Sequence, residues 1–527
     1  MKVLVSDNLG QAGIDIFENE SGIDVDVKTG LSPEELQAII PDYDALVIRS
    51  ATKVTEDLLN SGKNLKVVGR AGIGLDNVDI PTATKKGVVV MNTPGGNVVT
   101  TAEHTIALMM SLTRNIAQGT ASLKAGRWDK KKLQGREIMN KAMGVIGYGK
   151  IGSVVADRAR GLKMRVMVYD PVVSPETIEK KGFEAVTLDT LYQEADYISV
   201  HVPKSKNTLG MIDAAAFEKM KTGVMLINCA RGGIVDEAAL KDALESGKVA
   251  GAALDVFETE PLPADHPLLA FDNVVVTPHL GASTVEAQTN VAVAVAQQIV
   301  EYLKNNNIIN AVNVPSIPGK LLEKLQPYLY LADRMGCMVA QFTSGQLKEV
   351  RVEYNGDFQD LDMSPVTTGF MKGLLDPMVP DEVNSVNAPM LAKEKGIKVS
   401  ETSTAESQEF TNLISAEVVT TAETYRVAGT VFGKSDSRIV RINDFRIEIV
   451  PQGHLALIHN IDEPGAIGSI GNTLGENGIN ISRMQVGREA NGGNNIILIR
   501  TDTPINAAVI ESIQALSKVK NIRAFEL

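Results

Sequence analysis

The chain has 527 residues, 44% apolar and 22% charged, which is enough for three or four domains of ordinary globular composition. Its 52 Lys and Arg against 64 Asp and Glu give a net charge of −12, which argues against a nucleic-acid partner because phosphate backbones require extended basic surface. Two distant cysteines, Cys229 and Cys337, argue against disulfides and a metal site, and the charged start and the lack of a long apolar run lead us to expect a cytoplasmic protein without membrane contact.

Short β-branched runs alternate with helical stretches from the N-terminus onward. The predicted strands of a first series are residues 3–5, 45–48, 67–68 and 88–90, with helices at 32–40 and 55–61. A second series has strands at 145–146, 165–169, 197–200, 224–227, 252–255 and 274–277. This alternation predicts two Rossmann-like doubly wound α/β domains with parallel sheets.

Breaks in this pattern suggest the domain boundaries. A turn-rich segment at 92–97 leads into a helix from about 98 to 114, another helix is expected at 283–305, and Pro and Gly predict a linker at 313–319. Residues 321–451 are typical of a mixed α+β domain. Beyond them, the order strand 455–458, helix 465–475, strands 481–486 and 495–500, helix 505–516 and strand 522–526 predicts a ferredoxin-like βαββαβ module. The predicted domains are 1–97 completed by 288–316, then 98–287, 317–451 and 452–527.

A glycine motif, Gly147-Tyr148-Gly149-Lys150-Ile151-Gly152, lies between a predicted strand and a predicted helix. In that context its glycines allow a tight turn and the close approach of a pyrophosphate to the helix N-terminus. Asp170 ends the next strand, where an acid accepts hydrogen bonds from the adenosine ribose and its charge favours NAD over NADP. The alternative is a structural glycine turn followed by a strand-end cap.

Three candidate catalytic residues, Arg231, Glu260 and His279, follow three later strands. Strand ends of a doubly wound sheet converge on one ligand crevice, so we expect these side chains to share a site. A guanidinium can hold a carboxylate and polarise a carbonyl, an imidazole can exchange a hydroxyl proton, and a carboxylate can raise the pKa of that imidazole. The set suits hydride transfer involving a 2-hydroxy acid, although each residue taken singly could be an ordinary polar residue.

The chain resembles the D-isomer-specific 2-hydroxyacid dehydrogenases, and within them the long-form D-3-phosphoglycerate dehydrogenases. The resemblance covers about residues 1–316. It is carried by Asn92-Thr93-Pro94, Thr101-Ala102-Glu103-His104, the glycine motif, Asn228-Cys229-Ala230-Arg231-Gly232-Gly233, Asp255-Val256-Phe257 and Thr277-Pro278-His279-Leu280-Gly281-Ala282-Ser283-Thr284. It implies NAD-dependent oxidation of 3-phospho-D-glycerate to 3-phosphohydroxypyruvate, the first step of phosphorylated serine biosynthesis, with Arg231, Glu260 and His279 as catalytic residues.

The same resemblance implies the ligand contacts. Cofactor contacts are expected at Ile73, Gly147, Gly149, Lys150, Ile151, Gly152, Asp170, Cys229, Ala230, Arg231, Asp255, His279, Leu280, Gly281 and Ala282. Substrate contacts are expected at Arg49, Ser50, Arg70, Gly72, Ile73, Gly74, Arg231 and His279, and the basic cluster around Arg49 would select a phosphorylated substrate. The alternatives are a solvated basic loop at Arg49 and, for the whole protein, a reductase of glyoxylate, hydroxypyruvate or another 2-oxo acid, or an NAD-sensing regulator without turnover.

The C-terminal module resembles the ACT regulatory domain through the segments 460–465 and 478–481. In that family two such domains pair across a subunit boundary and hold a small amino acid. Asn460, Asp462 and Asn480 are therefore the expected effector ligands and L-serine the expected effector, while a purely oligomeric role is the alternative.

Two further features concern partners. Lys434, Arg438, Arg441 and Arg446 form either an anion site or a solvated charged strand face. Trp128 lies in an arm that crosses to a partner subunit in relatives, so we expect a homo-oligomer, either a dimer or a tetramer; packing within the chain is the alternative.

Overall fold

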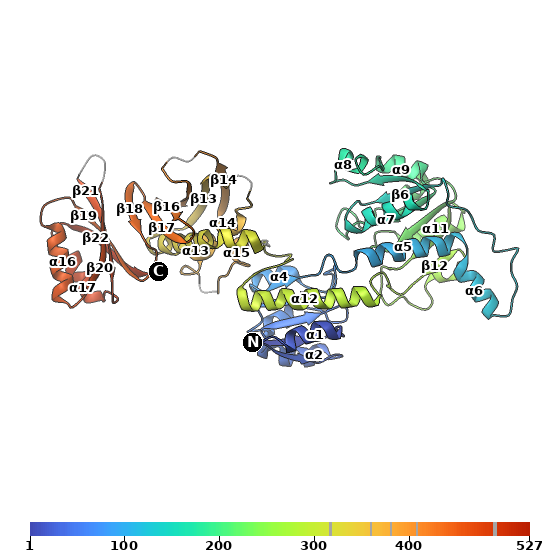
Figure 1. Cartoon of the computed structure of the whole chain (residues 1–527), viewed down its shortest axis with the longest axis horizontal. Coiled ribbons are helices and arrows are strands. Elements are labelled where there is room, and N and C mark those ends of the chain that lie inside the picture. Colours follow the sequence, from blue (N-terminus) through green and yellow to red (C-terminus); the bar gives the residue numbers. More distant parts are fainter. Residues whose placement is uncertain (316–318, 359–360, 380–381, 407–408, 489–492) are drawn as a thin grey trace. The chain divides into compact units, whose positions relative to one another are not determined.

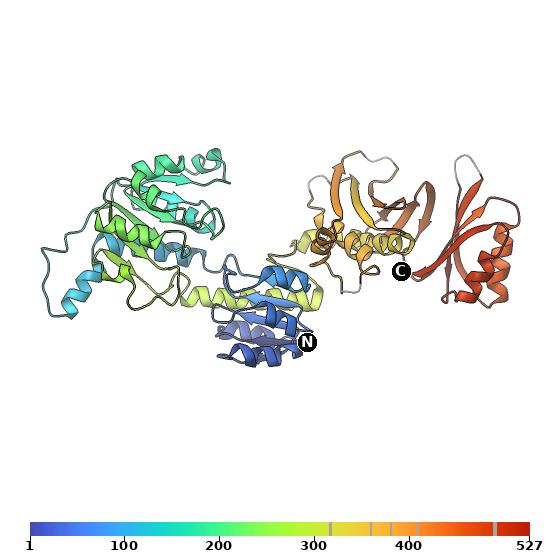
Figure 2. The same ribbon diagram turned by 180° about the vertical axis from the view of Figure 1, so that it is seen from behind.

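The structure is a computed structural model that describes residues 1–315, 319–358, 361–379, 382–406, 409–488 and 493–527 (Figures 1 and 2). Part of the expected linker, residues 316–318, lies outside the described residues. The chain divides into two compact units, one formed by Met1–Asn8, Ile14–Asn92 and Val295–Leu527, the other by Leu9–Gly13 and Thr93–Ala294. None of the described helices has the length and apolar character needed to cross a membrane.

A five-stranded parallel sheet opens the first unit. Its strands are β1 (Lys2–Val5), β2 (Asp24–Val27), β3 (Ala45–Ile48), β4 (Val67–Arg70) and β5 (Val89–Met91), in the order β2-β1-β3-β4-β5. The helices are α1 (Gln11–Glu18), α2 (Pro33–Ile39), α3 (Glu56–Ser61) and α4 (Ile80–Lys85). Ser32 and Thr55, predicted as the first residues of two helices, are instead N-caps that accept hydrogen bonds from backbone N–H groups of the first turn.

The second unit contains a seven-stranded parallel sheet in the order β12-β11-β10-β9-β6-β7-β8. Its strands are β6 (Ala142–Ile146), β7 (Arg165–Tyr169), β8 (Glu184–Ala185), β9 (Tyr197–Val200), β10 (Val224–Asn228), β11 (Val249–Leu254) and β12 (Val274–Val276). Between β6 and β9 the strand order reverses direction. In open parallel sheets such a switch point is where ligands bind, and here the glycine motif follows β6.

Helices cover both faces of this sheet. The buried side chains of α5 (Val98–Thr113), α7 (Lys150–Gly161) and α8 (Pro175–Glu179) share one core, and those of α9 (Leu188–Glu194), α10 (Ala214–Lys219) and α11 (Glu237–Glu245) share another. Helix α6 (Ile116–Lys124) and the extended segment after it project away from the sheet (Figures 1 and 2). The long helix α12 (Val285–Asn305) follows β12.

A six-stranded mixed sheet in the order β14-β13-β15-β16-β17-β18 comes next, with only β13 and β14 parallel. The strands are β13 (Leu347–Gly356), β14 (Lys398–Thr404), β15 (Asn412–Thr420), β16 (Thr424–Phe432), β17 (Asp436–Ile442) and β18 (Phe445–Ile449). Helices α13 (Gly319–Phe342), α14 (Ser364–Leu375) and α15 (Ala388–Glu394) contribute to the same hydrophobic core.

The last sheet is antiparallel in the order β20-β21-β19-β22. In chain order its elements are β19 (His454–Ile461), α16 (Ala466–Glu476), β20 (Ile481–Arg488), β21 (Asn494–Thr501), α17 (Ala507–Gln514) and β22 (Val519–Glu526), with both helices on one face (Figure 1). The predicted fold class is confirmed: two doubly wound parallel layers, an α+β domain and a βαββαβ module.

Candidate active site

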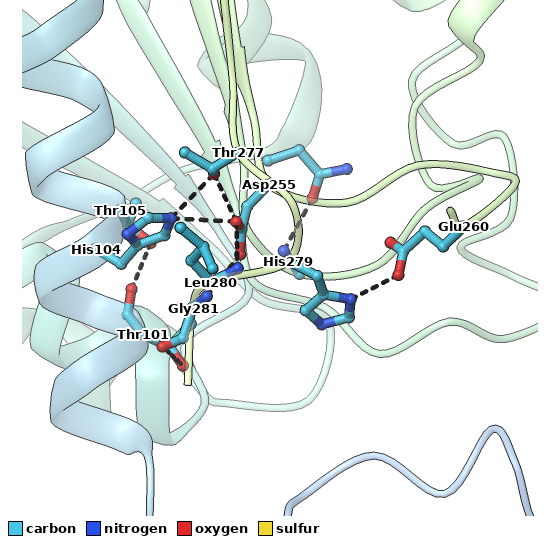
Figure 3. A network of polar contacts seen from close by, with 11 residues as sticks. Thr101, His104, Thr105, Asp255, Glu260, Thr277, His279, Leu280 and Gly281 are labelled. Carbon is cyan, nitrogen blue, oxygen red and sulfur yellow. Dashed lines mark hydrogen bonds and ion pairs between the residues drawn. The ribbon is translucent and has the colours of Figure 1, made fainter. Parts of the chain in front are cut away.

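The three candidate catalytic residues follow neighbouring parallel strands at the same edge of the seven-stranded sheet. Arg231 comes after β10, Glu260 after β11 and His279 after β12. Figure 3 shows the side chains of His279 and Glu260 facing each other, with Nδ1 of the imidazole 2.7 Å from Oε2 of the carboxylate. The other oxygen, Oε1, accepts the Phe257 N–H at 3.0 Å, which orients the carboxylate toward the imidazole.

The electrostatics of this pair favour a charged imidazole. The hydrogen bond to Glu260 raises the pKa of His279 above its ordinary value, and burial and the charge of Arg231 oppose that rise only in part. Burial alone would raise the pKa of Glu260, but the bonds from His279 and Phe257 outweigh it and the pKa lies below its ordinary value. Glu260 is therefore an ionised acceptor, Nδ1 of His279 carries a proton, and Nε2 is the nitrogen left to exchange a proton with a ligand.

The glycine loop has the close contacts that a dinucleotide-binding turn requires. Gly147 has a φ of +96°, and a Cβ atom added there would lie 2.6 Å from the His201 carbonyl oxygen. A Cβ at Gly152 would lie 1.9 Å from the Gly147 carbonyl oxygen, so no side chain fits between loop and helix. Helix α7 begins at Lys150 directly after Gly149, its N-cap, and the residues present thus fit a pyrophosphate at the helix N-terminus.

Asp170, expected at the adenosine ribose, lies just after β7 and beside this loop. Its carboxylate accepts the backbone N–H groups of Tyr148 at 2.7 Å, Val172 at 2.8 Å and Val173 at 2.9 Å. Burial alone would raise its pKa, but these bonds outweigh it and the pKa is lowered. Asp170 is therefore ionised at neutral pH, and its charge would repel a 2′-phosphate.

Two other expected cofactor residues, Cys229 and Asp255, have buried side chains. Cys229 is buried in the core on one face of the sheet, and burial raises the pKa of its thiol to about 12, so only its backbone is suited to a ligand contact.

Asp255 is 1% exposed, and its carboxylate accepts the N–H groups of Leu280 and Gly281, which are themselves expected cofactor contacts (Figure 3). Ala282 follows them directly, and Ala230 accepts a hydrogen bond from Arg231 at 2.7 Å.

The expected substrate residues of the first unit lie in two turns, after β3 and β4. The guanidinium of Arg49 donates to the Asn8 carbonyl at 3.0 Å. Arg70 bridges the two turns, because Nε donates to the Arg49 carbonyl at 3.1 Å and Nη1 to the Gly74 carbonyl. The N–H of Gly72 is used inside its own turn, where it donates to the Arg70 carbonyl at 2.9 Å.

The sequence pattern did not predict the residues that hold the turn after β3. Asp7 accepts the N–H groups of Arg49 at 2.6 Å and Thr52 at 3.1 Å, and it also accepts the Thr52 hydroxyl. Asn77 donates to the carbonyls of Arg49 and Thr52. The position of Asp7 just after a predicted strand was a usable signal, whereas nothing in the sequence pattern pointed to Asn77.

The expected effector residues do not meet within one chain. Asn460 pairs with Asn495 across β19 and β21, and Asn495 donates to Asp462 at 3.1 Å. The registers place Asn480 at the opposite end of the sheet, where it donates to Asp502 at 2.6 Å. Asn495 was not among the predicted effector ligands. Among the described residues, neither its buried Oδ1 nor that of Asn460 has a hydrogen-bond partner, so this end of the sheet offers two buried acceptors.

The remaining expectations concern exposed groups. Arg438 pairs with Asp436 and Glu448, and Arg441 and Arg446 both approach Glu409, which favours a charged strand face over a site for free anions. Trp128 is 81% exposed, so the structure does not show the alternative of packing within the chain.

Comparison with family models gives three matches along the chain. Residues 106–281 match the D-isomer specific 2-hydroxyacid dehydrogenase NAD binding domain, residues 324–443 the D-3-phosphoglycerate dehydrogenase intervening domain, and residues 454–518 the ACT domain. The glycine loop and the Arg231, Glu260 and His279 positions all fall within the first match.

Two relatives that match along their whole length have the same name. The D-3-phosphoglycerate dehydrogenase of Archaeoglobus fulgidus is 44% identical over 100% of both chains, and that of Bacillus subtilis is 41% identical over 100% of this chain and 99% of its own. Among solved structures, D-lactate dehydrogenase from Escherichia coli matches with 29% identity and a TM-score of 0.53 over 59% of this chain and 100% of its own. An NAD complex of formate dehydrogenase from Staphylococcus aureus matches with 28% identity and a TM-score of 0.54 over 60% of this chain and 100% of its own.

Proposed function

The chain belongs to the D-3-phosphoglycerate dehydrogenases, within the D-isomer-specific 2-hydroxyacid dehydrogenases, and from this membership we propose that it oxidises 3-phospho-D-glycerate to 3-phosphohydroxypyruvate. It is an NAD-dependent oxidoreductase, and this reaction would open a phosphorylated route to serine. The observation that carries the proposal is the His279–Glu260 pair at the edge of an NAD-binding sheet. An imidazole held by a carboxylate is well suited to act as the general base in alcohol oxidation.

The chain's own residues have distinct roles in the reaction. NAD, held by the Gly147–Gly152 loop and Asp170, would supply the hydride acceptor. Nε2 of His279 takes the hydroxyl proton during oxidation and returns it during reduction, while Glu260 stabilises the imidazolium that forms. Arg231 binds the substrate carboxylate and polarises the carbonyl with its guanidinium.

We assign the substrate phosphate to the turn after β3. Arg49, Ser50 and Arg70 supply charged and hydroxyl donors there, and charge-assisted hydrogen bonds of this kind are stronger than neutral ones. Since the N–H of Gly72 is already engaged, Ile73 and Gly74 are the backbone donors suited to the substrate carboxylate. Ile73 is also the assigned nicotinamide contact from this segment.

The assay that tests the proposal is NADH oxidation with three acceptors: 3-phosphohydroxypyruvate, hydroxypyruvate and glyoxylate. We expect kcat/KM for the phosphorylated acceptor to exceed the other two by about 100-fold, because two charge-assisted bonds are worth several kcal/mol. Equal values would reject phosphate selection and favour a general 2-oxo acid reductase. NADH binding without turnover of any acceptor would instead favour a regulator.

We also propose that L-serine inhibits the enzyme through residues Asn460, Asp462 and Asn480 of two paired C-terminal modules. In one chain Asn480 lies at the opposite end of the sheet, but two β20 edges paired antiparallel would bring it to the Asn460 end of a second chain. Asn495 adds an acceptor for the ammonium group. Titrating the assay with L-serine tests this, with Asn495→Ala expected to weaken inhibition at unchanged uninhibited kcat; unaltered inhibition in that variant would contradict the role of Asn495.

We propose that each predicted domain has its own function. Residues 1–97, completed by 288–316, bind substrate, and residues 98–287 bind NAD. Residues 317–451 form the intervening domain and residues 452–527 the ACT regulatory domain. The exposed Trp128 supports a homo-oligomeric enzyme, which we propose to be a dimer or a tetramer.

A further inference from the structure

The catalytic histidine lies in a strained turn. His279 has a φ of +54°, a left-handed conformation that residues with a Cβ adopt at a cost and keep only when their surroundings enforce it. Its N–H donates to the carbonyls of Asp255 and Thr277, both at 3.0 Å. The direction of the imidazole therefore depends on whatever holds the turn on either side of it.

Asp255 is the anchor of this turn. Oδ1 accepts the Leu280 N–H at 2.7 Å and the Thr277 hydroxyl at 2.6 Å, and Oδ2 accepts the Gly281 N–H at 2.8 Å (Figure 3). The carboxylate is almost completely buried, so it remains charged only while these donors surround it. The turn and the buried charge thus stabilise each other.

Helix α5 reaches this anchor from a part of the chain about 150 residues away. Nε2 of His104 lies 3.2 Å from Oδ1 of Asp255 and 3.2 Å from the Thr277 hydroxyl oxygen. One helical turn earlier, on the same face, the Thr101 hydroxyl donates to the Gly281 carbonyl at 3.0 Å. Because an ionised carboxylate can only accept, Nε2 of His104 carries the hydrogen and donates it to Asp255.

We propose that His104 is a positioning residue for the reaction. It clamps the Asp255-centred turn to α5, with Thr101 as a second clamp, and thereby keeps the His279 imidazole directed at Glu260 and at the substrate. This inference rests on the proposed function, since it assigns His104 a part in proton exchange at His279. A displacement of about 1 Å at such a group can lower a rate 100-fold, so removing the His104 contact should cause a measurable loss of rate.

The test uses the full chain, NADH and 3-phosphohydroxypyruvate. His104→Leu removes the donor and keeps an apolar volume, His104→Gln restores an N–H donor, and Thr101→Val removes the second clamp with little change in shape. Glu103→Gln is the matched control, because Glu103 neighbours His104 on α5 but its side chain is exposed and pairs with Arg158 at 3.7 Å rather than with the Asp255 turn. For each variant we would measure kcat, KM for NADH, the deuterium isotope effect with 4-deuterated NADH, and the thermal unfolding midpoint.

We expect His104→Leu to lower kcat at least tenfold with KM for NADH within threefold of wild type. The isotope effect should be at least as large as in wild type because the chemical step is slowed. His104→Gln should recover kcat to within about threefold, Thr101→Val should fall between the two, and Glu103→Gln should match wild type.

Other results would overturn the inference. Wild-type kcat in His104→Leu, or a Gln variant as slow as the Leu variant, would show that the donor has no positioning role. A loss of rate explained entirely by a lower unfolding midpoint would show the same. If His104→Leu does not fold, Thr101→Val still tests the inference. An inactive wild-type enzyme that still binds NADH would reject the proposed function itself, and the inference with it.

Discussion

At the scale of single residues, Glu260 sets both the direction and the charge of the His279 imidazole, the proposed catalytic group. Because it raises the pKa of His279, the imidazolium that reduction requires persists to higher pH than for a free histidine. The rate of reduction should therefore be high at low pH and fall as pH rises through the raised pKa. Oxidation, which requires the neutral imidazole, should rise over the same interval.

This assignment predicts the pH profile of Glu260→Gln. Without the negative charge the pKa of His279 drops, so the descending limb of kcat/KM for NADH-dependent reduction should move to lower pH, and kcat at neutral pH should fall by about 10²-fold. Profiles of wild type, Glu260→Gln and the exposed neighbour Glu258→Gln would be compared. A limb that stays in place in Glu260→Gln would show that the observed ionisation does not belong to His279.

Asp170 offers a second test at this scale, concerning the cofactor. In Asp170→Asn the charge disappears while an oxygen acceptor remains for the loop N–H groups, so discrimination against a 2′-phosphate should weaken. We expect the ratio of kcat/KM for NADH to that for NADPH to fall at least tenfold. The KM for the 2-oxo acid serves as the control and should not change. An unchanged cofactor ratio would place the ribose elsewhere.

At the scale of elements, Asp7 connects the end of β1 to the turn after β3. Since it binds the N–H groups of Arg49 and Thr52, it fixes the backbone that carries the proposed phosphate donors. In Asp7→Asn one of the two carboxylate acceptors becomes a donor and the turn loosens. We expect KM for 3-phosphohydroxypyruvate to rise about tenfold while KM for glyoxylate stays within twofold. A parallel rise for both acceptors would mean that Asp7 acts on the whole domain.

The same elements show what could be predicted from sequence and what could not. Arg231, Glu260 and His279 could be placed together because parallel strands present their ends at one edge, a rule that needs only strand positions. His104 could not be found this way, because helical periodicity gives the face of α5 but not which turn that face meets. Asn480 was grouped with Asn460 from the resemblance, and only the strand registers revealed their separation within a chain.

At the scale of the whole molecule, residues far apart in sequence complete the first sheet. Asn313 donates to the Val88 carbonyl and accepts the Val90 N–H, and Ala311 forms a bridge with Met91. The predicted boundaries, 1–97 completed by 288–316, assign this returning segment to the first domain, but local strand and helix patterns give none of its individual contacts. The order of the domains along the chain could be predicted from the sequence, whereas the contacts that complete each sheet depend on tertiary packing.

The segment that projects from the seven-stranded sheet gives the last prediction, which concerns assembly. Ile116, Leu123, Trp128 and Met139 are all exposed on α6 and the segment after it, and large apolar side chains gathered on one projecting part usually mark an interface. We expect Trp128→Glu to shift the enzyme toward a smaller species in light scattering coupled to gel filtration, because a buried unpaired charge opposes association. Val172→Glu is the control, since Val172 is at least as exposed as Trp128 but lies outside this segment. A wild-type mass for Trp128→Glu, or the same shift for both variants, would show that the projecting segment is not the interface between two copies of the chain.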